Sequence, residues 1–74
     1  SCENFTEIQD DMMWAVLQLP EKYRNCLYLF YYEDYSVREI ADILKLSESN
    51  AKVRLTRGRT LLRNVLKEEW DDDK

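Results

Sequence analysis

The side chains best suited to bind a ligand in this sequence lie between residues 49 and 57, where polar, basic and small apolar types alternate. Lys donates to the acceptors of guanine, Asn pairs with adenine through two hydrogen bonds, and the methyl groups of Val53 and Thr56 suit the methyl of thymine. At about 100° per residue, a helix carries these side chains on one side and presents an apolar stripe on the other. We predict contacts to DNA bases from Ser49, Asn50, Lys52, Val53 and Arg57.

Four further basic residues are placed for contacts to phosphates rather than to bases. They are Arg38, Lys45, Arg54 and Arg59. In the helical projection, Arg54 and Arg59 lie nearer the edges of the apolar stripe, away from the centre of the polar side. Phosphate contacts fix the position of a protein on DNA without reading its sequence.

A basic side of this kind is also found on helices that simply face solvent, and Glu48 with Lys52 forms a favourable i,i+4 pair that needs no DNA. The preceding residues favour the DNA interpretation. Ser36 and Glu39 have the spacing of a capping box, which predicts a helix over Val37–Leu44. Lys45 to Ser47 form a three-residue turn, and Ser47 caps a helix from Glu48 to about Lys67. This order is that of a helix-turn-helix.

Two more helices are predicted in the first half of the chain. A capping box at Thr6 and Gln9 begins the first, over Glu7 to Gln18, and Pro20 allows a second from Glu21 that ends at Glu33-Asp34. The inward positions of the second helix are Tyr23, Cys26, Leu27 and Phe30. The inward stripe of the last helix is Ala51, Leu55, Gly58, Leu62 and Val65. We therefore expect one all-α domain of four helices with a C-terminal helix-turn-helix and no sheet, spanning 6–70 between a linker remnant (1–5) and an acidic tail (71–74).

Charge is distributed unevenly along the 74 residues, whose net charge is −4. Residues 36–67 hold eight bases and three acids, whereas residues 1–35 hold two bases and seven acids. A basic segment between acidic ends is typical of a nucleic-acid face on a protein of low pI. With no histidine, no Gly-rich phosphate loop and no paired nucleophile and base, we expect no enzyme, metal, cofactor or small-molecule substrate. No run is long enough to span a membrane, and we expect a cytoplasmic protein.

Several motifs together resemble region 4 of bacterial sigma factors, in particular the extracytoplasmic-function (ECF) type. The matching pieces are LPEKYR from Leu19, YSVREIADIL from Tyr35, LSES from Leu46 and KVRLTRGRTLL from Lys52. They cover about two-thirds of the chain. The leading LPEKYR and the arginine spacing of the last piece distinguish this resemblance from a likeness to helix-turn-helix proteins in general.

This resemblance implies recognition of the minus-35 promoter element in transcription initiation, and docking on the β-flap of RNA polymerase core. It places the base-reading positions on these same five residues, in agreement with the helical projection, which also puts Thr56 on the polar side. Excess apolar positions on the second helix are candidates for the docking surface: Tyr28, Leu29 and Tyr32. An anti-sigma factor is a further implied partner.

Three positions depart from the family pattern. Lys45 stands where glycine is usual, Asn50-Ala51 where Thr-Val is common, and Gly58 where alanine is usual. If the backbone at Lys45 has positive φ, a residue with a Cβ is modestly strained there. Gly58 lowers the intrinsic helix propensity by on the order of 1 kcal/mol.

Two other functions remain open at this point. A LuxR-like or response-regulator domain would use the same helix-turn-helix as an independent regulator, and would bind paired half-sites cooperatively. A helical protein-interaction module would bind through its acidic ends and tyrosines, and would lack the steep salt dependence of DNA binding.

Overall fold

The computed structural model describes residues 11–71. They form a short helix over residues 11–17, then α2 (Glu21–Tyr31), α3 (Val37–Leu44) and α4 (Glu48–Asp71), with no strand among the described residues. The expectation of an all-α domain of four helices is confirmed. The predicted start of the first helix at Glu7, and the linker assigned to residues 1–5, lie outside the described residues.

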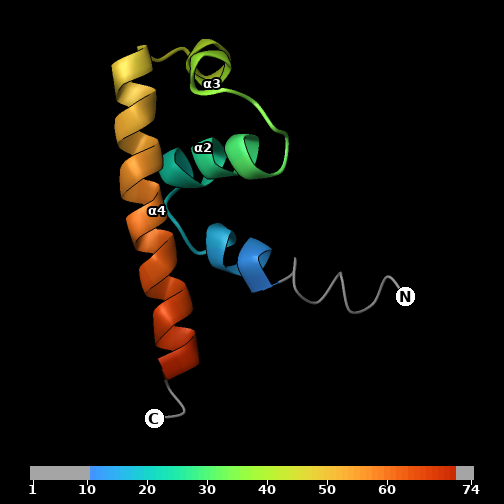
Figure 1. Ribbon diagram of the computed structural model, residues 1–74, viewed down its shortest axis with the longest axis vertical. Helices are drawn as coiled ribbons and strands as arrows, with labels where there is room; N and C mark the ends of the chain where they lie inside the picture. Colours follow the sequence, from blue (N-terminus) through green and yellow to red (C-terminus); the bar gives the residue numbers. More distant parts are fainter. Residues whose placement is uncertain (1–10, 72–74) are drawn as a thin grey trace, which may run out of the picture.

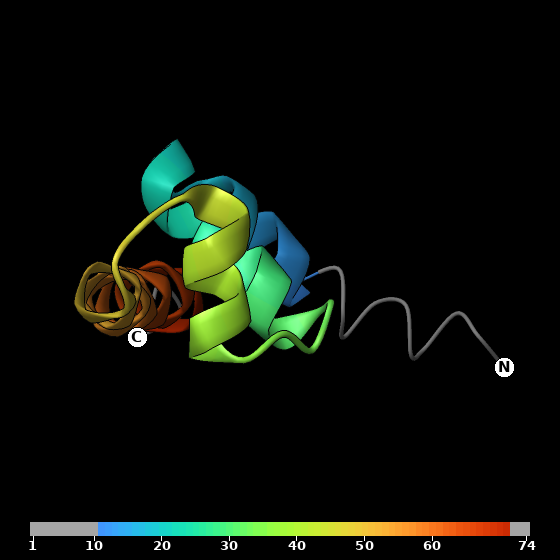
Figure 2. The same cartoon turned by 90° about the horizontal axis from the view of Figure 1, so that it is seen from above.

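Helix α4 forms one side of the molecule along its whole length. The first helix, α2 and α3 are stacked one above another along the same flank of α4, with α2 in the middle (Figure 1). The view from above agrees, because α4 appears end-on at one side with the other helices beside it (Figure 2). One flank of α4 is therefore used for packing, and the opposite flank is left uncovered by the other helices.

The core lies where the three shorter helices meet α4. Its buried hydrophobic residues are Ala15, Val16, Leu19, Cys26, Leu27, Ile40, Ala41, Ala51, Leu55 and Leu62. Every described helix contributes, and those of α4, together with the buried Gly58, recur every three to four residues, as the predicted inward stripe requires. On α2, Tyr23 and Phe30 pack against this core from partly buried positions. The predicted inward faces of both helices are confirmed.

Gly58 packs closely against Leu27 and Tyr23 of α2. A Cβ atom built on Gly58 would lie 3.1 Å from Cδ1 of Leu27 and 3.3 Å from Cβ of Tyr23. These distances are shorter than ordinary van der Waals contact, so an added methyl group would require Leu27 to shift. The lower helix propensity of glycine is thus offset by closer packing of the two helices.

Two helix ends differ slightly from the sequence-based expectation. Helix α2 ends at Tyr31, and the amide of Tyr32 still donates to the carbonyl of Tyr28 at 2.9 Å. Helix α4 continues past Lys67 to Asp71, and so includes the first residue of the predicted acidic tail. Residues 68–71 contain no glycine or proline, and glutamate is a good helix former, so nothing local stops the helix at Lys67.

Leu55 provides a direct test of this core, because its side chain is 1% exposed and lies at the centre of the α4 stripe. We expect Leu55→Ala to lower the free energy of unfolding by about 2–5 kcal/mol, a large part of the stability of so small a domain. Urea denaturation followed by circular dichroism measures this. Leu17→Ala is the matched control: Leu17 is 54% exposed, and its truncation is expected to change stability by less than about 0.5 kcal/mol. Similar effects of the two changes would contradict the assigned core.

Candidate nucleic-acid interface

Helix α3 is fixed at its start by the predicted capping box. The amide of Glu39 donates to Oγ of Ser36 at 3.2 Å, and the amide of Ser36 donates to Oε1 of Glu39 at 2.8 Å. These reciprocal bonds satisfy two amides that the helix itself cannot, and they confirm the prediction. Ile40 and Ala41 then anchor the helix in the core.

The turn between α3 and α4 depends on Lys45, which adopts the left-handed conformation with φ 60° and ψ 48°. The amide of Leu46 donates to the carbonyl of Ala41 at 2.8 Å, and the amide of Lys45 donates to that of Asp42 at 3.3 Å. Together these bonds form a Schellman motif, whose left-handed residue is most often glycine. The backbone at Lys45 does have positive φ, so this lysine holds a position that strains any residue with a Cβ.

Helix α4 begins immediately after this turn, because Oγ of Ser47 accepts a hydrogen bond from the amide of Asn50 at 3.1 Å. The prediction that Ser47 caps α4 is confirmed. A capped start directly after a fixed turn sets the direction of α4 and the rotation of its faces. It therefore determines which side chains of α4 turn away from the core.

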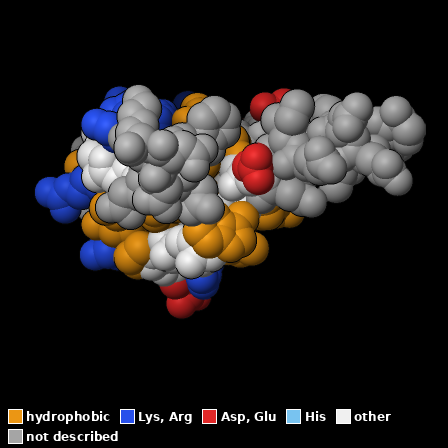
Figure 3. All heavy atoms as spheres, turned by 90° about the horizontal axis from the view of Figure 1, so that it is seen from below, with side chains coloured by type: hydrophobic (Ala, Val, Ile, Leu, Met, Phe, Trp, Pro, Cys, Tyr) orange, Lys and Arg blue, Asp and Glu red, His pale blue; other side chains and the backbone are white. Residues whose placement is uncertain are grey.

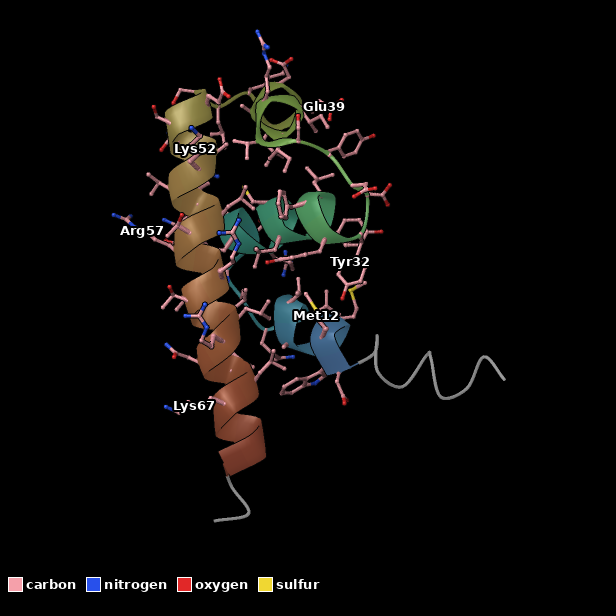
Figure 4. The ribbon with its side chains drawn as sticks, viewed as in Figure 1. Met12, Tyr32, Glu39, Lys52, Arg57 and Lys67 are labelled. Atoms are coloured by element: carbon pink, nitrogen blue, oxygen red, sulfur yellow. The ribbon has the colours of Figure 1, made fainter. Side chains whose placement is uncertain are left out.

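All five residues predicted to contact bases are exposed on α4: Ser49, Asn50, Lys52, Val53 and Arg57. Figure 4 shows Arg57 pointing away from the helices that pack on the other flank of α4. The side chain of Val53 is 41% exposed, an unusual placement for an apolar residue in a run of polar ones. The structure thus brings the predicted set together on one accessible surface.

A shallow open depression lies on this surface of α4, lined by Lys52, Val53, Thr56 and Arg57. Thr56 is the one lining residue absent from the predicted base contacts. The helical projection carried the signal, since it places Thr56 between Lys52 and Val53 on the polar side. The projection gives the direction of each side chain around the helix, but it cannot show the depression that the four side chains form together.

The four residues predicted to contact phosphates fall into two groups. Arg38 and Lys45 are exposed on α3 and its turn, whereas Arg54 and Arg59 are half-buried on α4. The guanidinium carbon of Arg59 lies 5.5 Å from the centre of the Phe30 ring, within range of a cation–π interaction that the sequence did not predict.

Arg54 lies close enough to the buried thiol of Cys26 to affect its titration. Burial raises the pKa of Cys26, and the positive charge of Arg54 lowers it by a smaller amount. The thiol therefore stays protonated near neutral pH and behaves as a small hydrophobic core group. This agrees with the expectation that Cys26 belongs to the core.

The apolar residues of α2 proposed for docking differ in accessibility. Tyr28 is exposed and stacks on Tyr32 with ring centroids 5.5 Å apart, whereas Leu29 packs against the core. The hydroxyl of Tyr32 is buried without a hydrogen-bond partner among the described residues. A hydrogen bond with Glu33, together with the charge of that carboxylate, raises the pKa of Tyr28, which keeps the phenol neutral. Tyr28 is thus the most accessible of the three.

Side-chain types are segregated on the surface as well. In the view from below, Lys and Arg side chains gather along the edge formed by α4, and hydrophobic side chains lie next to them (Figure 3). Across residues 11–71, no group of three or more His, Cys, Asp or Glu side chains is placed to hold a metal ion. No helix in the described part of the chain is long and apolar enough to cross a membrane.

The arrangement of a capped helix, a fixed turn and an outward-facing basic helix matches a known family. The family model for sigma-70, region 4, matches residues 10–62, which include all of α2 and α3 and most of α4. This chain belongs to the sigma-70 region 4 family. The resemblance inferred from the sequence motifs is confirmed, and the match does not favour a LuxR-like regulator.

Curated relatives of this region 4 domain are sigma factors of Bacillus subtilis (strain 168). The ECF RNA polymerase sigma factor SigW is 36% identical over 62 residues, covering 84% of this chain and 33% of SigW. The RNA polymerase sigma factor SigZ is 40% identical over 65 residues, covering 86% of this chain and 37% of SigZ. The ECF sigma factor SigM is 30% identical over 67 residues, covering 90% of this chain and 41% of SigM.

The chain therefore spans about a third to two-fifths of the length of these relatives. No solved structure gives a significant match to it.

The turn of this region 4 domain is open to a stability test at Lys45. We expect Lys45→Gly to raise the free energy of unfolding by about 1 kcal/mol, because glycine adopts the left-handed conformation without strain. Lys45→Ala is the matched control, since it removes the same charge and keeps a Cβ at positive φ. Urea denaturation of the three proteins separates strain from charge. Equal stability of the Gly and Ala variants would contradict the strain at this turn.

Proposed function

We propose that this chain reads the minus-35 element of promoter DNA with the uncovered face of α4, as region 4 of an ECF sigma factor in transcription initiation. Its membership of the sigma-70 region 4 family supports this proposal. Its relatives in Bacillus subtilis are RNA polymerase sigma factors, which supports it further.

The observation that carries the proposal is the division of α4 into two faces. Ala51, Leu55 and Leu62 are buried, whereas Lys52 and Arg57 are exposed, and Arg57 points away from the packed helices (Figure 4). A helix held along one side and free along the other can enter the major groove without losing its core contacts. The capped helix α3 and the turn that follows it, ending at the Ser47 cap, give α4 a fixed orientation.

The proposed base contacts are Ser49, Asn50, Lys52, Val53 and Arg57, all within the first three turns of α4. Such N-terminal residues of a recognition helix are the ones that meet base edges. The proposed phosphate contacts are Arg38, Lys45, Arg54 and Arg59. Arg38 and Lys45 are free to move toward DNA, while Arg59 would bind phosphate from its position over the Phe30 ring.

The proposed protein partner is RNA polymerase core, bound through its β-flap, with an anti-sigma factor as a further partner. The exposed ring of Tyr28 on α2 and its stacked neighbour Tyr32, directly after α2, offer aromatic surface, whereas Leu29 is partly buried against the core. We place this activity in the cytoplasm, where polymerase acts, and assign no catalytic step to the chain. Its role is to position the enzyme on promoter DNA.

The test is to measure binding of Lys52→Ala and Arg57→Ala to a duplex that the wild-type chain selects from a randomised pool. Each change removes a donor from the proposed reading face, and we expect affinity to fall on the order of tenfold or more. Fluorescence anisotropy at low ionic strength measures this, because phosphate contacts are strongest there. Circular dichroism verifies that the fold is intact, since both side chains are exposed.

Lys67→Ala is the matched control for these variants. Lys67 is exposed on the same helix, but lies 15 residues beyond Lys52, on the order of 20 Å along the axis. We expect it to retain nearly wild-type affinity. Equal losses from Lys52→Ala and Lys67→Ala would show a general charge effect and overturn the assigned reading face.

A further inference from the structure

The shallow depression on α4 has an apolar middle and cationic edges. Lys52 and Thr56, and likewise Val53 and Arg57, are i,i+4 neighbours, so the four side chains enclose a small diamond on the helix surface. Val53 and Thr56 supply methyl groups to it, whereas Lys52 and Arg57 supply positive charges at opposite corners. An exposed apolar spot framed by two cations suits a ligand that has an apolar group next to a hydrogen-bond acceptor.

Among the base pairs of DNA, the major-groove edge that has this combination is that of thymine, which carries a C5 methyl group beside the O4 acceptor. Cytosine offers a donor at the corresponding position and no methyl group, and guanine offers two acceptors without an apolar group. A cation next to a methyl-sized depression therefore favours thymine over cytosine. The flanking cations are also suited to guanine acceptors on neighbouring base pairs.

We infer that the depression formed by Lys52, Val53, Thr56 and Arg57 receives the C5 methyl group of one thymine, and that Thr56 is a specificity-determining residue of this domain. This inference rests on the proposed reading of DNA by α4. It adds Thr56 to the proposed base contacts, and it places the thymine contact that the residue types of Val53 and Thr56 suggest in one depression of α4. In this arrangement Val53 and Thr56 contact the methyl group, while Lys52 or Arg57 donates to O4 of the same base or to an adjacent guanine.

The placement of Val53 supports this role over a structural one. Its side chain is 41% exposed and is not among the residues that pack against the core. The side chain of Thr56 is exposed too, and no other described helix contributes to the depression. Folding therefore does not require either methyl group, and both are available for contact with a ligand.

The experiment replaces each thymine of the selected duplex in turn by deoxyuridine, which removes the C5 methyl group and changes nothing else on the major-groove edge. For the wild-type chain we expect one such replacement to lower affinity about fourfold, the equivalent of ~0.8 kcal/mol for one buried methyl group. In Thr56→Ser and Val53→Ala, which remove methyl groups from the depression, the same replacement should cause almost no further loss.

Thr60→Ser is the matched control, because it removes the same methyl group from an exposed threonine one turn later. The hydroxyl of Thr60 donates to the carbonyl of Thr56 at 3.3 Å, a bond that serine can also form. This variant should retain the sensitivity to deoxyuridine of the wild-type chain. Loss of that sensitivity in Thr60→Ser but not in Thr56→Ser would overturn the assignment.

The outcomes also separate this inference from the proposed function. If the chain selects no duplex over random DNA, both fail. If it selects a duplex and depends on Lys52 and Arg57, but no thymine position is sensitive to deoxyuridine, the proposed function stands and the thymine assignment is wrong. The assignment is also wrong if wild type, Thr56→Ser and Val53→Ala lose equal affinity on the same replacement.

Discussion

The contact between Gly58 of α4 and Leu27 of α2 is the constraint on which the arrangement of this domain depends. Without a Cβ at residue 58, the two helices approach so closely that an added methyl group would lie 3.1 Å from Leu27. The side chains next to this contact, Leu55 and Leu62, are buried along the same flank of α4. Packing thereby fixes the rotation of α4 about its own axis, and with it the set of side chains that face outward.

The direction of α4 is determined at its start by hydrogen bonds within the helix-turn-helix. Ser36 and Ser47 cap the two helices, and the backbone of Lys45 takes the left-handed conformation between them. A long helix with a fixed rotation and a fixed start can present small side chains such as Val53 and Thr56 reproducibly. Base reading requires this, because contacts to base edges are short and directional.

The distribution of charge complements this geometry. Exposed cations are concentrated on residues 36–67, while the rest of the chain is acidic. Acidic flanks reduce non-specific attraction to the phosphate backbone, so the proposed base contacts on α4 would contribute a larger share of the affinity. This division of charge is consistent with a domain that acts as one part of a larger assembly.

Much of this arrangement is predictable from the sequence, because the signals are local. The capping box at Ser36, the cap at Ser47 and the apolar stripe of α4 each depend on residues within a few positions of one another. The close approach at Gly58 and the position of Arg59 over Phe30 could not be predicted, because each joins segments far apart in the chain. The sequence suggests only a weakened helix at Gly58, whereas the structure gives the residue a packing role.

The shape of the depression at Thr56 also could not be predicted from the sequence, because it depends on how four neighbouring side chains are oriented together. The family pattern also did not indicate that Tyr28 is exposed while Leu29 packs against the core, nor that Tyr28 stacks on Tyr32.

The most direct test of the central claim, that the uncovered face of α4 reads DNA, is amide chemical-shift mapping of the chain during titration with a selected duplex. The account predicts that the largest shifts fall on residues 47–57 and on the start of α3, with little change on α2 and on the first helix. Largest shifts on α2 around Tyr28, with residues 47–57 unchanged, would contradict it.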